Sequence, residues 1–295
     1  MNINHPDFNQ PVIGVDIGGT TIRCGRVQNG RIVSVMQADV PHTDLAEIVL
    51  ETITGLITEL MVERAAGIGV GVPGIVDKQR GIVFDVVNIP SWKKVYLKEE
   101  LERRFMLPVH INNDANCFAI GERYFGYGRE MDDFVGLVTG TGMGAGIIKK
   151  GHLLPDQNCG SGEFGIIPYL DKTLEYYCSG NFFKVFYGLS AEEAAMLAEA
   201  GHPVALEAFD QYGKHLGAAV KMVMAALDPE AVIIGGGVSR TFRYYEKAMR
   251  HEILGFPYAG PAGKIKILAS RIDNIAILGA SALCHEMAIQ TPETG

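Results

Sequence analysis

A glycine-turn pattern occurs twice in the sequence, and this repeat constrains the fold more than any other feature. Near the N-terminus, PVIGVDIGGTTIRCGRVQNGRIVS places a Gly-Gly turn between two apolar strands and an Asn-Gly turn before a third strand. From residue 134, FVGLVTGTGMGAGIIKKGHLL repeats this order with a Lys-Gly turn. The two turns are twelve residues apart in the first copy (Gly18 to Gly30) and eleven in the second (Gly140 to Gly151). We therefore expect two similar halves that each begin with antiparallel strands.

The chain length agrees with two domains. A single hydrophobic core stops growing at roughly 250 to 300 residues, and this chain has 295. No low-complexity linker separates the halves, so the boundary near residue 117 rests on the repeat alone. We expect an N-terminal α/β domain at 1–117, a larger C-terminal α/β domain at 118–275, and a last helix at about 276–290 that packs back on the first domain.

Several other elements can be predicted from periodicity. Apolar residues at a helical period follow Asp44, and Glu47 three residues later predicts a capping box. A second helix is expected to end at Phe105, a strand to begin at Val109, and a long helix to occupy residues 206–227 before the buried strand AVIIGGGVS.

Charge and composition exclude some classes of function. The net charge of -8 and a pI near 5.5 provide no basic patch for a nucleic-acid backbone. No basic and apolar leader opens the sequence, and no segment reaches the roughly 18 unbroken apolar residues of a membrane span, so we expect a soluble protein without a membrane partner. Five scattered cysteines without a C-x-x-C pair favour a reducing compartment, and the expected location is the cytoplasm.

Three glycine turns at strand ends could bind a nucleotide. Glycine has no Cβ, so its backbone can approach a phosphate closely, and neighbouring hydroxyls and amides supply donors. Any one of these turns, taken alone, can instead be interpreted as a tight hairpin with no role in ligand binding. The expected phosphate and nucleotide contacts are Gly18, Gly19, Thr20, Thr21, Thr139, Gly140, Thr141, Gly142, Gly235, Gly236 and Gly237.

The second turn also fits a dinucleotide-binding pattern. GTGMGA matches G-x-G-x-x-A, and Glu163 lies at about the distance expected of the ribose-binding acid. That motif requires a helix directly after the glycines, whereas β-branched residues and another turn follow here. The pattern therefore argues against a dehydrogenase.

A polar cluster at the end of the strand VHI has the composition of a sugar site. In NNDAN, Asp114 could accept the proton of a sugar hydroxyl while Asn113 bonds a neighbouring hydroxyl. The alternative is an Asx turn or a helix N-cap for the segment CFAIGERYF, and both interpretations can hold for different residues. Glu163 and Glu175 lie beside further glycine turns, where they could clamp hydroxyls or simply be solvated.

The motifs together resemble those of the ROK sugar kinases over nearly the whole chain. DIGGT and TGTGMGAGI resemble the family's two phosphate motifs, GVPGIVD and NIPSW its sugar-side loops, NNDAN its catalytic segment and IIGGGVS its nucleotide segment. The resemblance implies an α/β fold of duplicated ribonuclease-H-like (actin/hexokinase-type) domains with an inter-domain cleft. It also implies ATP and Mg²⁺ as cofactors.

The resemblance assigns roles by position. Asp114 would be the catalytic base, and Asp16 would lie near magnesium, directly or through water. The implied sugar contacts are Gly74, Asn88, Asn113, Glu163 and Glu175.

Two departures from the family pattern matter. Ile166 replaces a histidine that would contact metal and sugar, and the cysteine-rich zinc motif before Glu175 is replaced by the short YLDKT. We therefore expect no zinc, although Cys159, Cys178 and His152 could form a substitute site. The loop around Glu175 must then be held by packing, for which the sequence offers Tyr176, Tyr177, Phe182 and Phe183.

We thus expect ATP-dependent phosphorylation of a glucose-like hexose at its 6-hydroxyl, with domain closure bringing Asp114 to the reacting hydroxyl. The alternative is a catalytically idle sugar sensor of the same family, which the loss of the histidine at Ile166 favours. Small sugars and nucleotides are the expected partners. The oligomeric state stays open, with a homodimer the form that the family often takes.

Overall fold

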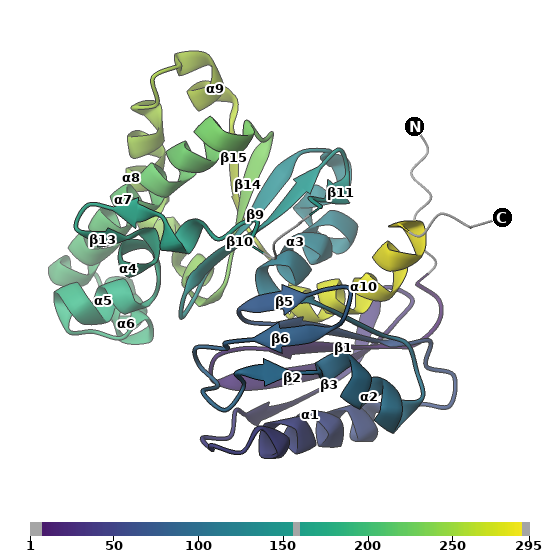
Figure 1. Ribbon diagram of the computed structural model, residues 1–295. Coiled ribbons are helices and arrows are strands. Elements are labelled where there is room, and N and C mark those ends of the chain that lie inside the picture. Colours follow the sequence, from purple (N-terminus) through teal and green to yellow (C-terminus); the bar gives the residue numbers. More distant parts are fainter. Residues whose placement is uncertain (1–7, 156–159, 291–295) are drawn as a thin grey trace. The chain divides into compact units, whose positions relative to one another are not determined.

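The computed structural model describes residues 8–155 and 160–290, and it divides into two compact units (Figure 1). The first unit comprises Met1–Arg129, Pro155–Gly160 and Ile272–Gly295, and the second comprises Glu130–Leu154 and Ser161–Arg271. The first unit thus extends beyond the boundary expected near residue 117, because that residue lies within a helix that packs on the first sheet.

The first unit is built on a five-stranded mixed sheet in the order β3-β2-β1-β4-β8. The first three strands are antiparallel, whereas β4 and β8 run parallel to β1. Their bounds are Val12–Ile17 (β1), Thr21–Gln28 (β2), Arg31–Asp39 (β3), Ile68–Val72 (β4) and Val109–Asn113 (β8). The predicted turn between β2 and β3 is present, with Asn29 and Gly30 both at positive φ.

Helices cover both faces of this sheet (Figure 1). On one face, α1 (Ala46–Leu60) packs on β2 and β3, and on the other α10 (Ile275–Gln290) packs on β1 and β4 beside α3 (Asp114–Phe125). The approach of α10 is so close that a Cβ on Gly69 would lie 1.8 Å from the carbonyl oxygen of Ala280. The last helix therefore belongs to the first unit, although it follows the second in sequence.

The predicted capping box at the start of α1 is wrong. The helix begins at Ala46 without a side-chain cap, and the Thr43 hydroxyl accepts the N–H of Leu45. The Glu47 carboxylate pairs instead with Arg104 of α2 (Leu97–Phe105). A long-range ion pair has replaced the local hydrogen bond that the spacing suggested.

A small three-stranded sheet extends the first unit beyond β4. It consists of β5 (Ile75–Asp77), β6 (Ile82–Phe84) and β7 (Lys94–Val95). The run GIGVGVPGIVD, read as one strand, is divided between β4 and β5 because Gly74 turns the chain with φ at 91°.

The second unit repeats the topology of the first, as the glycine repeat predicted. Its sheet has the order β11-β10-β9-β14-β15, again with three antiparallel strands followed by two parallel ones. The strands are Phe134–Thr139 (β9), Met143–Lys149 (β10), His152–Leu153 (β11), Ala231–Gly235 (β14) and Lys266–Ala269 (β15). This duplicated α/β sheet confirms the expected fold class.

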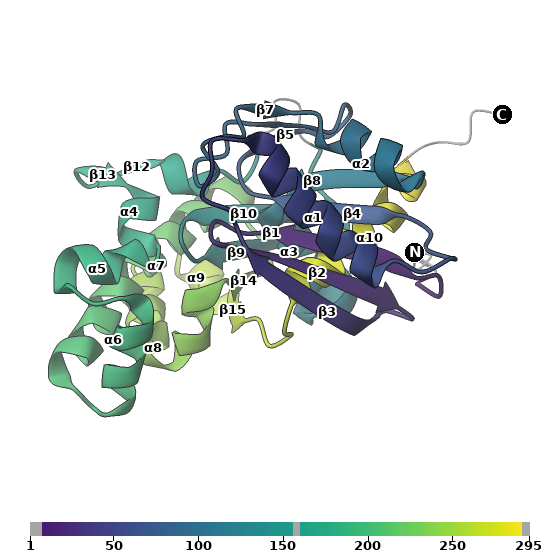
Figure 2. The same ribbon diagram turned by 90° about the horizontal axis from the view of Figure 1, so that it is seen from below.

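Helices of the second unit enclose a core rich in aromatic side chains. The long predicted helix is α7, which lies beside α8 in both views (Figures 1 and 2). The helices are Leu174–Cys178 (α4), Asn181–Tyr187 (α5), Ala191–Glu199 (α6), Pro203–Leu227 (α7), Phe242–Leu254 (α8) and Ala259–Lys264 (α9). Short 3-10 turns at Tyr127–Glu130 (η1), Phe164–Ile166 (η2) and Gly237–Thr241 (η3), and a hairpin of Pro168–Tyr169 (β12) and Lys172–Thr173 (β13), complete the elements. Within the part of the chain that the structure describes, no helix is long and apolar enough to cross a membrane.

Candidate active site

Parallel strands bring the polar residues of the first unit to one edge of its sheet. Asp16 on β1 is aligned with Gly71 on β4, and Gly71 is aligned with Asn112 on β8. Ligands of α/β proteins usually bind at the carboxyl ends of such strands. The first glycine turn, the Gly74 turn and the NNDAN segment all follow these strand ends.

The first glycine turn, residues 18–21, lies directly against Asn88. Its backbone is closed by a hydrogen bond of 2.9 Å from the N–H of Gly18 to the oxygen of Thr21. A Cβ on Gly19 would lie 2.7 Å from Nδ2 of Asn88, so a larger residue would displace that exposed amide. A predicted sugar contact and a predicted phosphate turn are therefore neighbours in the first unit.

Asp16 is a partly buried carboxylate at the end of β1. Burial raises the pKa of Asp16 to about 6, although Arg23, whose Nη1 lies 3.9 Å from Oδ2, acts in the opposite direction. The raised pKa shows that the carboxylate charge is poorly compensated here, and a bound cation would compensate it.

The residues present suit a magnesium ion held by one carboxylate together with phosphates and waters, rather than an ion held entirely by protein side chains. The described residues contain no group of three or more His, Cys, Asp or Glu side chains that could hold a metal ion. Mg²⁺ commonly binds through one or two carboxylates, with phosphates and waters as its other ligands. Asp16 could provide the protein ligand of such an ion.

The start of α3 realises both interpretations of the NNDAN cluster, on different residues. Asn113 is the N-cap, and its Oδ1 accepts the N–H groups of Ala115 at 2.9 Å and Asn116 at 3.4 Å. Its Nδ2 donates to the oxygen of Gly74 at 3.1 Å. Asp114 is the first helical residue, is half-buried, and accepts the N–H of Ala115 with Oδ1 at 2.9 Å. The helix N-terminus favours the negative charge of this carboxylate.

Cys117 is a residue of this site that the sequence reasoning missed. Its Sγ lies 3.1 Å from where a Cβ on Gly71 would be. Burial raises the pKa of the Cys117 thiol well above its usual value, and the charges of Asp16 and Asp114 raise it further. The thiol is therefore uncharged and serves to fill space. The effect of the two carboxylate charges on its pKa shows that both carboxylates lie near it. One turn of α3 separates Asp114 from Cys117, which is the signal that could have revealed this.

In the second unit, the second glycine turn (residues 139–142) lies against the third (residues 235–237). The buried hydroxyl of Thr139 donates to the oxygen of Gly235 at 3.3 Å. Gly236 has φ at 87°, and a Cβ there would lie 2.2 Å from the oxygen of Thr139. The structure thus brings together the two turns that were expected to hold different parts of a nucleotide.

Glu175 lies on the second glycine turn, a contact that the sequence reasoning did not foresee. Its Oε2 accepts the N–H of Met143 at 2.9 Å, although the residue as a whole is exposed. Glu163 precedes η2 and is half-buried, and the same short helix contains Ile166, which is 70% exposed. Both acidic residues that were predicted to contact the sugar are therefore in the second unit, near the strand β10.

Strand β10 follows the second glycine turn directly and pairs with β9 in antiparallel fashion. The dinucleotide pattern needs a helix at this point. The structure confirms that the match to G-x-G-x-x-A is incidental.

Aromatic packing holds the segment that carries Glu175, as predicted. Tyr177, Phe182 and Phe183 belong to the core of the second unit, and Tyr176 packs against it. Tyr177 stacks on Phe186 with ring centroids 5.5 Å apart.

Two of the residues named for a substitute metal site lie among those that the structure describes. Cys178 is fully buried in the core of the second unit, where burial raises its pKa, and His152 is exposed on β11. Cys159 lies outside the described residues.

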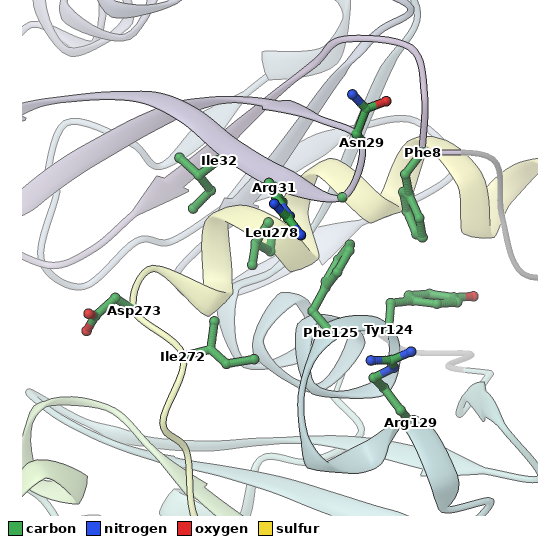
Figure 3. A pocket seen from close by; sticks show the side chains of 11 residues that line it. Phe8, Asn29, Arg31, Ile32, Tyr124, Phe125, Arg129, Ile272, Asp273 and Leu278 are labelled. Carbon is green, nitrogen blue, oxygen red and sulfur yellow. The ribbon is translucent and has the colours of Figure 1, made fainter.

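A cavity of the first unit lies away from these residues (Figure 3). It has a volume of about 590 Å³ and is formed by the turn between β2 and β3, the last turn of α3 and the start of α10. Arg31 and Arg129 line it together with Tyr124 and Phe125. It is at the opposite end of α3 from Asp114 and includes no predicted site residue.

Comparisons with known proteins agree with this arrangement. The family model described as "ROK family" matches residues 12–287. A glucokinase of Thermotoga maritima is 32% identical over 93% of this chain and 97% of its own length. An N-acetyl-D-glucosamine kinase of Vibrio vulnificus is 31% identical over 79% of this chain and 86% of its own length.

A solved structure shows the same similarity in three dimensions. The ROK family glucokinase of Streptomyces griseus, determined in complex with glucose and AMPPNP, has a TM-score of 0.80 and 29% identity, and the match covers 92% of this chain and 98% of that one. On the family match over almost the entire sequence, this chain belongs to the ROK family.

Proposed function

We propose that this protein is a sugar kinase that transfers the γ-phosphoryl group of ATP to a hydroxyl of a hexose. The observation that carries the proposal is the position of Asp114, a half-buried carboxylate at the N-terminus of α3 beside the sugar-side residues Asn113 and Gly74. The glucokinase and N-acetyl-D-glucosamine kinase relatives support the reaction class.

In this proposal Asp114 takes the proton of the attacking hydroxyl. A loose phosphoryl-transfer transition state asks little of a base beyond position, so an aspartate is adequate. Asn113 fixes the start of α3 and thereby the position of the neighbouring carboxylate. Asn88, Gly74, Glu163 and Glu175 are proposed to contact the sugar.

The glycine turns are proposed to bind the nucleotide. Residues 18–21 and 139–142 would present backbone N–H groups and threonine hydroxyls to the phosphates, and residues 235–237 would lie against the ribose or base. When bound with ATP, magnesium would neutralise part of the phosphate charge. Asp16 would hold it, directly or through water, because this carboxylate lacks a strong counter-charge.

Glucose is the proposed substrate and its 6-hydroxyl the proposed acceptor. The names of the relatives support glucose first and N-acetyl-D-glucosamine second. Ile166 presents an apolar, exposed side chain where the resemblance implies a histidine, so one sugar hydroxyl would lack a ring nitrogen as partner. We therefore expect that the protein discriminates less strongly among hexoses, or that it prefers a different hexose.

A panel of sugars tests the proposal directly. The protein is incubated with ATP, magnesium and glucose, N-acetylglucosamine, mannose, fructose or allose, and ADP release is measured. The proposal predicts sugar-dependent ADP release that ends when magnesium is chelated. ADP release that no sugar stimulates would refute it.

The exposed Ile166 favours a second candidate, an idle sugar sensor of the same fold. A sensor would bind sugar in a thermal-shift assay, with an increase in melting temperature, but would release no ADP. The same panel therefore separates the two candidates.

We also propose a cytoplasmic location, since the reaction needs ATP and the described cysteines are unpaired thiols. The acidic net charge of -8 argues against a nucleic-acid partner. A homodimer is the proposed assembly, and light scattering would measure it.

A further inference from the structure

Helix α4 is tied to the second glycine turn at two points. The N–H of Met143 donates to Oε2 of Glu175 at 2.9 Å, and the N–H of Gly180, just beyond the helix, donates to the oxygen of Gly140 at 2.7 Å. One bond holds the turn itself at Gly140, and the other holds Met143, the first residue of β10, directly after the turn. Both come from one short segment of the chain, residues 174–180.

This segment is itself firmly anchored. Leu174 and Cys178 are fully buried, and the buried hydroxyl of Tyr212 on α7 donates to the oxygen of Cys178 at 2.9 Å. The aromatic packing around Tyr177 fixes its other side. A displacement of the Glu175 carboxylate would therefore be passed to the glycine turn, since the helix beneath it cannot easily follow.

The carboxylate of Glu175 has a second oxygen for a ligand. Among the residues that the structure describes, no hydrogen bond reaches Oε1, and the side chain is exposed. One oxygen thus holds the phosphate turn, while the other can accept a bond from a sugar hydroxyl.

The glycine turn needs such a support. Gly140 and Gly142 have more backbone freedom than other residues, and this freedom must be given up when a phosphate is bound. A contact that already restricts the turn lowers the entropy cost of nucleotide binding, and a ligand that orders this contact lowers it further.

We propose that Glu175 is a positioning residue that couples the two substrates: a sugar hydroxyl on Oε1 orders the carboxylate, and Oε2 thereby orders the N–H of Met143 and the glycine turn for ATP. This inference rests on the proposed function, because it takes Glu175 as a sugar contact. The coupling is reciprocal, so bound nucleotide raises sugar affinity by the same factor.

The glycine at 142 provides a test that leaves Glu175 intact. A Cβ at this position would lie 2.6 Å from Oε2 of Glu175 and meets no other group within 4 Å. Gly142→Ala therefore displaces the carboxylate from Met143 without another clash. Once Glu175 is removed, the same substitution should have no further effect on the coupling, because the methyl meets no other protein group.

Calorimetry with AMPPNP, with and without saturating sugar, measures the coupling. In the wild type we expect sugar to tighten nucleotide binding by about 5-fold or more, a common size for such coupling. Gly142→Ala and Glu175→Ala should reduce this factor to about 1, which corresponds to a coupling free energy of about zero. Glu175→Gln is the matched control and should retain the coupling, because its amide oxygen can still accept the N–H of Met143 and its amide nitrogen can donate to the oxygen of the same sugar hydroxyl.

The double variant Gly142→Ala/Glu175→Ala completes a cycle. The factor by which sugar tightens its nucleotide binding should equal that of Glu175→Ala alone, because the added methyl then meets no protein group. Sugar-dependent tightening that returns in the double variant would overturn the proposal, as would wild-type coupling in Gly142→Ala.

Hydrogen exchange tests the contact independently of any reaction. The amide of Met143 should exchange faster in Glu175→Ala than in the wild type or Glu175→Gln, and thermal unfolding should confirm that all variants are folded. Equal exchange in all three proteins would overturn the proposal even if the protein is an active kinase. Conversely, absence of sugar-dependent ADP release, with the exchange pattern as predicted, would refute the proposed function and leave the contact established.

Discussion

The side-chain amide of Asn113 donates to the main-chain oxygen of Gly74 across 3.1 Å, while its oxygen caps α3. One side chain therefore fixes both the helix that begins at Asp114 and the turn where β4 passes into β5. Two substitutions separate these tasks.

Asn113→Ala removes the cap and the bond to Gly74. We expect it to lower the free energy of unfolding by about 1 kcal/mol, the usual value for an N-cap, in urea titrations. Asn113→Asp keeps a capping oxygen but places a carboxylate against the oxygen of Gly74. It should have stability close to that of the wild type and a several-fold higher KM for sugar, and an unchanged KM would contradict a role for the Gly74 contact.

Two glycines of the first unit should respond to alanine in opposite directions. Gly69→Ala would bring a Cβ to 1.8 Å from the oxygen of Ala280, and two main chains cannot easily separate, so we expect a loss of about 3 kcal/mol or more. Gly55→Ala, in the exposed face of α1 with no neighbour within 4 Å, should stabilise by up to about 1 kcal/mol. Urea unfolding measures both, and equal effects would contradict the close packing of α10 on β4.

His215 should make the second unit sensitive to acid. Its Nδ1 lies 3.1 Å from the Tyr169 hydroxyl, and its ring is 4.8 Å from that of Tyr177. Burial lowers the pKa of His215; Glu252 acts against this shift and Lys214 reinforces it. The folded state therefore binds fewer protons than the unfolded state below about pH 6.5, so stability is fully present above that pH and is lost as the pH falls.

The measurement is the unfolding free energy at pH 7.5 and pH 5.5. We expect the wild type to lose more stability over this interval than His215→Phe. Substitution of the exposed His251 by Phe is the control and should leave the wild-type pH dependence unchanged. A His215→Phe variant with the full pH dependence would contradict the assignment.

Much of the fold could be predicted because its signals are local and repeated. Glycine turns between apolar segments indicated both antiparallel starts, and the strand VHI followed by NNDAN indicated the junction of β8 and α3. The capping box at Asp44 failed because Glu47 is in contact with Arg104, a residue 57 positions away. The predicted boundary near residue 117 was placed from the repeat alone, and the repeat does not show that α3 and α10 pack together.

The parts of the site that the sequence did not reveal depend on contacts across the chain. Glu175 was identified as an acid near a glycine turn, but its bond to Met143 spans 32 positions and has no local signature. The position of Cys117 beneath Gly71 likewise follows from sheet and helix packing. The residue types at the site were therefore predictable, whereas their partners were not.

Asp114→Asn examines the proposed base itself, because asparagine keeps the shape of the side chain but cannot take the proton. ADP release with the best sugar and, in parallel, sugar affinity by calorimetry are measured for the variant and the wild type. We predict a fall in turnover of about 10²- to 10⁴-fold, with sugar affinity kept within a few-fold. A variant that turns over at the wild-type rate would show that Asp114 is not the base.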